Sequence, residues 1–348
     1  MSNPVPRTSP LDGLGVSAPV LAAPMGGGPT TAALVTAAAQ SGGMGFLAGG
    51  YKTAQQLAEQ IAEVRAATQV FGVNLFAPNP IAIDPAEYRR YAKALRPLAE
   101  RYGVELPPDP VEDDDQWTAK LDVLHRDPVP VVSFTFGLPS SEVIASLRSQ
   151  GSIVVQTVTN AAEARAATDA GVDMLAVQGS AAGGHSATLT PSRLPDPIPT
   201  AELVPMIRDA TRCPVVAAGG LATPAQVAAV IHAGAQAVMI GTALLLTTES
   251  GASAVHKAAV ADHSRAETVL TRSFTGRPAR GIRNRFIDEH DASAPAGYPA
   301  IHYLTGPIRK AAAAAGDPEA VHLWAGTEYQ QATTGAAAEV LRALATAL

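Results

Sequence analysis

Residues 153–178, IVVQTVTNAAEARAATDAGVDMLAVQ, decide the fold. The stretch begins with a short apolar run, Ile153–Val158, and continues through an alanine-rich segment of helical composition, Ala161–Ala170. It ends in a second apolar run, Met174–Gln178. Both apolar runs are nearly continuous rather than alternating, which is typical of parallel strands covered on both faces. The stretch therefore predicts one strand–helix–strand unit of a parallel α/β protein.

The same unit recurs along the chain. The other strand candidates are Val20–Ala23, Met44–Ala48, Val70–Phe76, Val129–Phe134, Val215–Ala218 and Ala237–Ile240, and helix candidates include Thr31–Gln40, Thr53–Ala67, Glu202–Thr211 and Pro224–Ala233. With the first two runs, this makes eight strands. A doubly wound sheet usually has about five or six strands, whereas eight strand–helix units close into a barrel. We therefore expect an α/β fold of the TIM (β/α)8 barrel type, ringed by alanine-rich helices.

Composition excludes several classes of protein. The net charge is -6 and only 16% of the 348 residues are charged, so no basic surface for nucleic acid or an anionic membrane is expected. The chain contains no apolar run of about 18 residues, and Met1–Pro10 lacks the apolar core of a secretory signal. The single cysteine, Cys213, excludes an intramolecular disulfide and a cysteine-rich metal site. We expect a soluble cytoplasmic protein, monomeric or homodimeric.

Two segments interrupt the alternation of strands and helices. Residues 77–127 form an insertion after the third strand, with a helix predicted at Pro85–Tyr102, an acidic stretch and a second short helix. Residues 250–348 follow the eighth strand, with helix candidates at Gly251–Ala261, Thr305–Ala315 and Ala336–Ala347. This extension has few aliphatic residues, so we expect it to have no core of its own. The prediction is a single domain, residues 1–348, whose C-terminal helical extension lies over the barrel mouth.

The loop after the sixth strand carries the most informative polar residue. It contains Gly183, Gly184 and His185, and loops at the C-terminal ends of barrel strands form the active sites of such folds. The glycines allow the backbone to approach a ligand closely. His185 is the best candidate for a proton acceptor near neutral pH, although a histidine in a loop can equally cap a helix or face water.

Two further glycine-rich loops suggest a phosphate site. Ala218-Gly219-Gly220 follows the seventh strand, and Gly241-Thr242 follows the eighth. Loops after these two strands form the recurrent phosphate site of TIM barrels, which uses backbone N–H groups. Neither loop contains a basic residue, so the charge of a phosphate would be balanced mainly by backbone dipoles.

Residues after three other strands could contact an aromatic ring. Ala23-Pro24-Met25 follows the first strand and offers a flat apolar wall, without a dinucleotide-binding or P-loop glycine pattern. Asn74 and Gln178 are polar residues that close apolar strands, and their amides can donate and accept toward a ring edge.

Other chemistries lack their required patterns. The remaining histidines show no metal-ligand spacing, and no GxSxG nucleophile motif is present. Cys213 precedes the seventh strand and is interpreted as structural. Asp113–Asp115 is interpreted as a solvated loop, and Arg277, Arg280, Arg283 and Arg285 either pair with acids or bind an anionic substrate.

These motifs resemble the nitronate monooxygenase family, formerly called 2-nitropropane dioxygenases. The resemblance is carried by AAPM, FGVNLF, AGGH, PVVAAGG and IGT in that order, and by the tail segments YPAIHYLTGPIR (298–309) and LWAG (323–326), which are similar to the bacterial class I branch. It implies an FMN-dependent enzyme that oxidises alkyl nitronates, such as propionate 3-nitronate, or nitroalkanes with O2 to a carbonyl compound and nitrite, without a metal or nicotinamide.

The resemblance also implies roles for individual residues. His185 would be the active-site base or the hydrogen-bond donor that positions the nitro group. The extension would close the substrate pocket with Tyr298, His302 and Tyr303. The cofactor would be bound by Ala23, Pro24, Met25, Asn74 and Gln178 around the ring, and by Gly183, Gly184, Ala218, Gly219, Gly220, Gly241 and Thr242 toward the phosphate.

Two alternatives remain open. An NAD(P)H-dependent FMN reductase, of the enoyl-ACP reductase or quinone reductase type, shares the AGGH loop, whereas the long insertion and tyrosine-bearing tail favour the nitronate branch. The second alternative is a flavin-binding protein without catalytic activity. It is favoured only by Ala181, because relatives usually carry glutamate before Ala-Gly-Gly-His.

Overall fold

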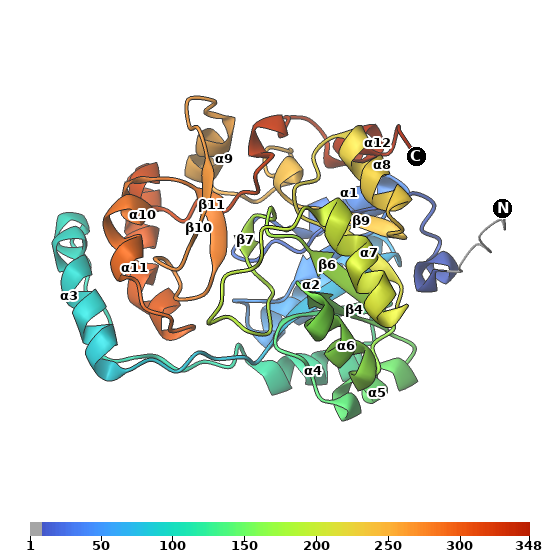
Figure 1. Cartoon of the computed structure of the whole chain (residues 1–348), viewed down its shortest axis with the longest axis horizontal. Coiled ribbons are helices and arrows are strands. Elements are labelled where there is room, and N and C mark those ends of the chain that lie inside the picture. The colour runs from blue at the N-terminus through green and yellow to red at the C-terminus, as the bar shows by residue number, and fades with distance from the viewer. Residues whose placement is uncertain (1–8) are drawn as a thin grey trace.

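The computed structural model describes residues 9–348, and its centre is a closed barrel of eight parallel strands (Figure 1). The strands are β1 (Val20–Ala22), β2 (Gly45–Ala48), β3 (Phe71–Ala77), β4 (Val131–Phe136), β5 (Ile153–Val158), β6 (Met174–Gln178), β8 (Val215–Ala218) and β9 (Ala237–Ile240). The ring closes because β9 pairs in parallel with β1. The predicted TIM barrel is confirmed, with all eight strands where the apolar runs placed them. Residues 1–8, which hold most of the segment Met1–Pro10 used to judge a secretory signal, lie outside the described part.

Eight helices surround the barrel. They are α1 (Ala32–Gln40), α2 (Ala54–Ala67), α4 (Trp117–Arg126), α5 (Ser141–Ser149), α6 (Ala161–Ala170), α7 (Thr200–Thr211), α8 (Pro224–His232) and α12 (Ala337–Leu344). Several begin at a side-chain cap: Thr53 and Gln56 form a capping box at α2, and Thr223 and Gln226 form another at α8. Their alanine-rich inner faces and the outer faces of the strands form one continuous buried cluster.

The last barrel helix lies at the far end of the chain. α12 packs against α1, α8 and β1, in the position that an eighth barrel helix occupies after β9. The segment between β9 and α12 is therefore inserted into the last strand–helix unit. Within the predicted extension, residues 250–348, the final helix belongs to the barrel itself.

The inside of the barrel is closed at the N-terminal ends of the strands. Leu21, Phe46, Val131 and Val155 point inward and pack together, and Leu11 from the 3-10 helix η1 (Pro10–Leu14) joins this cluster. Because large side chains fill this end, a ligand has room only at the C-terminal ends of the strands.

The insertion contributes one helix to the barrel and one to the extension. α4 packs on β3 and α2 as a barrel helix, whereas α3 (Pro85–Tyr102) lies away from the barrel against α11 (Ala300–Ala314) (Figure 1). Tyr88, Tyr91 and Leu95 of α3 are buried in a second hydrophobic cluster with the extension. The expectation that the extension has no core of its own was wrong, because most of this cluster comes from the extension itself, including Phe274 and Ile301, and α3 adds to it.

The extension contains a sheet that the sequence did not predict. After α9 (Ala254–Ala261), strands β10 (Thr268–Thr271) and β11 (Ala279–Ile282) pair antiparallel, and β7 (Gly184–His185) adds to β11. α10 (Arg285–His290), α11 and short 3-10 helices follow: η3 (Asp291–Ser293), η4 (Pro318–Ala320) and η5 (Tyr329–Gln331), with η2 (Thr242–Leu244) preceding α9. The extension thus pairs directly with the loop that holds His185.

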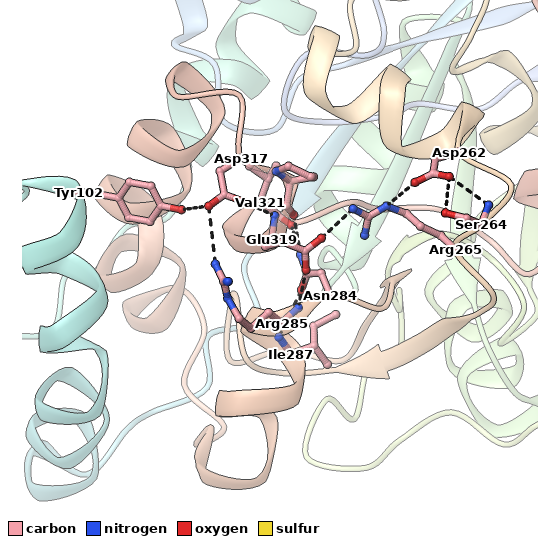
Figure 2. A network of polar contacts seen from close by, with 11 residues as sticks. Tyr102, Asp262, Ser264, Arg265, Asn284, Arg285, Ile287, Asp317, Glu319 and Val321 are labelled. Carbon is pink, nitrogen blue, oxygen red and sulfur yellow. Dashed lines mark hydrogen bonds and ion pairs between the residues drawn. The ribbon is translucent and has the colours of Figure 1, made fainter.

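Polar contacts fix α3 and the extension to each other (Figure 2). The Tyr102 hydroxyl donates to Asp317 Oδ2 at 2.7 Å, and Arg285 pairs with the same carboxylate at 3.7 Å. Arg265 pairs with Glu319 at 2.7 Å and with Asp262. None of the helices in residues 9–348 is both long and apolar enough to cross a membrane.

Candidate active site

One cavity of about 430 Å³ opens at the C-terminal ends of the barrel strands. Its lining comes from the barrel strands, from the loops that follow them and from the extension. The lining includes every residue predicted to bind the cofactor, namely Ala23, Pro24, Met25, Asn74, Gln178, Gly183, Gly184, Ala218, Gly219, Gly220, Gly241 and Thr242, together with His185 and His302. The structure thus brings together residues from across the chain.

Glycines at one part of the cavity leave no room for side chains. A Cβ atom on Gly183 would lie 2.6 Å from the backbone of Ala325 and Gly326, where the extension crosses the loop. Gly219 and Gly220 have φ angles of 103° and 69°, which L side chains rarely adopt. The lining here is therefore mostly backbone, as a cradle for an anionic group requires.

Thr242 connects this cradle to the extension. Its Oγ1 accepts a hydrogen bond from Gly326 N at 2.9 Å, so the hydroxyl hydrogen remains free to donate toward the cavity. Ala181, where the resemblance led us to expect glutamate, accepts at its backbone oxygen from Thr327 N at 3.1 Å. A Cβ on Gly220 would lie 2.9 Å from Ala181 Cβ, so the Ala181 side chain faces Gly220 closely.

The amides of Asn74 and Gln178 are held differently. Asn74 donates from Nδ2 to Ser133 Oγ at 2.9 Å and to Thr135 Oγ1 at 3.0 Å, which leaves its carbonyl oxygen as the group that can accept from a ligand. Both ends of the Gln178 amide bind the histidine loop, since Nε2 donates to His185 O at 3.1 Å and Oε1 accepts from Ala187 N at 2.8 Å. Gln178 therefore lines the cavity and also holds the backbone of His185.

Aromatic side chains and a hydroxyl surround His185. Its Nε2 lies 3.0 Å from Thr275 Oγ1, on the loop between β10 and β11. Its ring lies 5.5 Å from the ring centroids of Phe136 and Trp324 and 5.9 Å from that of Tyr298. These contacts fix the imidazole against the cavity, so the His185 ring has one defined orientation.

Burial lowers the pKa of His185 to about 3, and the nearby positive charges of Arg277 and Arg309 add to this effect. The imidazole is therefore uncharged at neutral pH. An uncharged ring accepts and donates one hydrogen bond each. It is a weak proton acceptor, because a general base works best with a pKa near the working pH.

Arg277 organises the loops around His185. It is fully buried, and its guanidinium lies 4.1 Å from the centroid of the Phe136 ring. It donates to backbone oxygens of the histidine loop, Ser186 and Thr188. Of the four arginines considered from the sequence, Arg280 binds a backbone oxygen of the same loop, at Ser180. Arg283 and Arg285 form ion pairs with acidic residues instead.

The three residues predicted to close the substrate pocket lie at different depths. His302 lines the cavity, stacked on the ring of Tyr51 with centroids 4.5 Å apart. Tyr298 lies behind the lining, and its hydroxyl donates to that of Tyr51 at 3.3 Å. Tyr303 donates to Asp113 of the insertion. A direct contact of Tyr298 or Tyr303 with substrate therefore stays a prediction.

One residue of the acidic stretch in the insertion, Asp115, is held in an ion pair instead of facing solvent. Asp115 accepts from Tyr51 N at 2.9 Å and pairs with Lys120 at 2.7 Å, and the Lys120 side chain is only 1% exposed. The interpretation of Asp113–Asp115 as a solvated loop was wrong for Asp115, whereas Asp113 and Asp114 are exposed. Asp115 holds Tyr51, and Asp113 holds Tyr303, at the edge of the cavity.

Sequence reasoning missed several lining residues. Besides Tyr51, they include Phe76, Phe136, Thr275, Arg309, His322, Trp324 and Glu328. Arg309 and Trp324 lie in the tail segments that carry the resemblance, but no role followed from it for either. The pairing of β7 with β11 helps to bring the extension to the barrel. Within residues 9–348, no group of three His, Cys, Asp or Glu side chains is placed to hold a metal ion.

A barrel with a cavity and a backbone-lined cradle at this end has the arrangement of a TIM-barrel enzyme. The model of the nitronate monooxygenase family matches residues 8–346 of the chain. A probable nitronate monooxygenase of Staphylococcus aureus is 37% identical over 326 residues, which cover 92% of this chain and 91% of the relative. The chain belongs to the nitronate monooxygenase family, whose members are flavin-dependent oxidoreductases.

Solved structures agree with this assignment. A nitroalkane oxidase from Streptomyces ansochromogenes is 46% identical, with a TM-score of 0.92 and 96% of each chain covered. FabK from Thermotoga maritima is 24% identical, with a TM-score of 0.74, and 96% of this chain and 93% of that one are covered. The second likeness shows only that the fold is shared.

Proposed function

We propose that this protein is an FMN-dependent nitronate monooxygenase that uses O2 to convert alkyl nitronates to a carbonyl compound and nitrite. The observation that carries the proposal is the uncharged His185, held beside a glycine-lined cavity in a chain of this family. The nitroalkane oxidase and the staphylococcal relative support the same reaction class.

The residues of the cavity fit a flavin mononucleotide. Gly183, Gly219, Gly220 and Thr242 would hold the phosphate, because the cavity lining there is backbone with one free hydroxyl hydrogen. Met25 and Asn74 would contact the ring system. Bound there, FMN would supply the one-electron oxidation of the nitronate and the reaction with O2.

The charge around His185 favours the nitronate anion over the neutral nitroalkane as substrate. Removing a proton from carbon needs a base with a pKa near the working pH, which His185 lacks. The same two arginines that lower its pKa stabilise a bound anion. His185 therefore hydrogen-bonds the nitronate. Thr275 holds its imidazole in place, and Gln178 holds its backbone.

The extension limits access of water to this site. Trp324 packs beside His185, and the segment around Ala325 crosses directly over Gly183. Bulk water would weaken the hydrogen bonds and charge interactions that orient an anionic substrate. The extension thus completes the cavity.

The test mixes FMN-loaded protein anaerobically with propionate 3-nitronate in one sample and with NADPH in another. We expect the visible flavin spectrum to change after mixing with the nitronate. Over the same time after mixing, NADPH should leave the spectrum unchanged. Rapid bleaching by NADPH without a response to nitronate would replace the proposal with the reductase alternative.

The same preparation tests the non-catalytic alternative suggested by Ala181. A flavin spectrum that responds to neither reagent would support a binding protein. Failure of the purified protein to take up FMN at all would overturn both flavin-based accounts.

A further inference from the structure

Arg309 is a buried cation that lines the cavity and has no acidic partner. It lies on α11 and is 7% exposed. Transferring a guanidinium from water to such a place is unfavourable unless an anion or several hydrogen bonds compensate. Among the described residues Arg309 forms no ion pair, in contrast to the buried Lys120, which pairs with Asp115. The single carboxylate in the cavity lining, Glu328, does not contact it.

All the partners of Arg309 are neutral. Its Nε donates to Thr305 Oγ1 at 3.0 Å, and its Nη2 donates to the backbone oxygen of His302 at 2.7 Å. Nη1 lies 3.2 Å from His322 Nδ1, and Nη2 lies 3.4 Å from His302 Nδ1. These contacts orient the guanidinium and leave its charge uncompensated.

The two histidine contacts fix the positions of the ring protons. A guanidinium can only donate hydrogen bonds, so Nδ1 of His302 and of His322 must be unprotonated. In an uncharged ring the proton then lies on Nε2. Burial lowers the pKa of both residues well below the usual value, in keeping with uncharged rings. Neither Nε2–H has an acceptor within residues 9–348, and both rings line the cavity.

Packing holds these donors in place. The His302 ring stacks on Tyr51 at an interplanar angle of 3° and meets Tyr303 edge-on. His322 contacts Trp324 with centroids 5.4 Å apart. A cation with two fixed N–H donors suits a planar oxyanion, whose oxygens accept several hydrogen bonds in one plane.

We propose that Arg309, His302 and His322 form a binding site for a planar oxyanion, separate from the glycine-lined cradle. The site deepens the proposed function and rests on it for its natural ligand: the oxyanion is either the nitronate group of the substrate or a carboxylate elsewhere on the same molecule. Arg277 cannot serve in this way, because it does not line the cavity.

Binding is measured with nitrite and with acetate on the FMN-loaded protein at constant ionic strength, with chloride as the reference anion. Saturable changes in the flavin spectrum and in the melting temperature give the dissociation constants. We expect Arg309→Gln to weaken nitrite binding at least about tenfold, since a charge-assisted hydrogen bond is lost. Arg309→Lys should retain part of the affinity.

Two further variants serve as controls. Lys310→Gln removes the same charge from an exposed neighbouring position on α11 and should leave the affinity unchanged. His322→Phe keeps a ring and the Arg309 charge but removes the Nε2–H donor, and it should weaken binding about threefold to tenfold. It also tests the site if Arg309→Gln fails to fold. Wild-type protein that shows no saturable binding of either anion, or variants that bind like wild type, would overturn the proposal.

Turnover identifies which part of the substrate occupies the site. If Arg309 binds the nitronate group, Arg309→Gln raises the KM for propyl-1-nitronate and for propionate 3-nitronate alike. If it binds a carboxylate, only the KM for propionate 3-nitronate rises. Anion binding needs no turnover, so nitrite binding that depends on Arg309 in a protein without nitronate oxidation would support the site and contradict the proposed function.

Discussion

At the scale of single residues, the site is built around uncharged imidazoles and buried arginines. His185, His302 and His322 all have lowered pKa values, and two guanidiniums lie close to them. This arrangement concentrates positive charge while each ring keeps only the single proton of an uncharged imidazole. It therefore suits an anion that arrives already deprotonated.

Thr275 should act on the reaction through His185. Replacing Thr275 with valine removes the hydroxyl 3.0 Å from Nε2 while keeping a similar volume. We expect kcat/KM for a nitronate to fall about tenfold, because the imidazole loses the group that orients it. Thr275→Ser restores the hydroxyl and should restore most of the rate, with FMN content equal in all three proteins. A serine variant as impaired as the valine variant would contradict this positioning role.

The stability of the protein should fall as the pH falls below about 6.5. His185 has a folded-state pKa of about 3, below its unfolded value, so the unfolded chain binds more protons between these two pH values. The contribution of His185 to the free energy of unfolding is fully present above its pKa in the unfolded chain. It declines toward pH 3 by up to about 1.4 kcal/mol per pH unit.

Urea unfolding of the FMN-free protein at pH 7, 6 and 5 measures this dependence. His185→Phe should show a shallower decline, because it removes one of the groups that take up protons on unfolding. An equal slope in wild type and variant would show that His185 does not contribute.

At the scale of elements, some loops and strands of the site could be predicted from the sequence and others could not. The glycine loops after β6, β8 and β9 were recognisable because backbone contact needs glycine at fixed places after a strand. The β10–β11 hairpin was missed because its strands, TVLT and ARGI, have only four residues each and no clear alternation. Arg309 and His322 were missed for a related reason, since only tertiary packing of the extension brings them to the cavity.

The crossing of the extension over Gly183 predicts a specific effect of one methyl group. Gly183→Ala would place Cβ 2.6 Å from the backbone at Ala325 and Gly326, so the extension must move away from the cradle. We expect FMN affinity to fall at least about tenfold, which equilibrium titration of the apoprotein measures. Gly103→Ala, at a helix end where a Cβ meets open space, is the matched control. It should cost about 1 kcal/mol of stability and leave FMN affinity unchanged.

The buried ion pair of the insertion predicts a larger effect on stability. Lys120→Met leaves Asp115 buried without its cation, and we expect a loss of about 3 kcal/mol in the free energy of unfolding. Arg90→Gln breaks an exposed pair with Glu87 and should cost less than about 1 kcal/mol. Chemical denaturation of both variants compares them. Equal losses would show that Lys120 does not support the insertion as the structure indicates.

At the scale of the whole molecule, the barrel could be predicted from the sequence. The insertion and the extension, which together form a cover over the barrel mouth, could be predicted only in outline. Eight apolar runs defined the barrel, because each strand is buried on both faces. The cover is assembled from the insertion and the extension, which share one hydrophobic cluster although α3 and α11 are about 200 residues apart in sequence. Local patterns do not record such a contact. The extension's own core and the return of α12 to the barrel were therefore not foreseen.

Oxygen uptake on addition of propionate 3-nitronate to the FMN-loaded protein, without NAD(P)H, tests the central claim most directly. From the barrel, the glycine-lined cradle and the uncharged His185, we expect immediate oxygen consumption with formation of nitrite. We also expect much slower consumption with freshly dissolved 3-nitropropionate, before it ionises at carbon. Oxygen uptake that requires NAD(P)H, or that is absent with nitronate in protein fully loaded with FMN, would contradict the account.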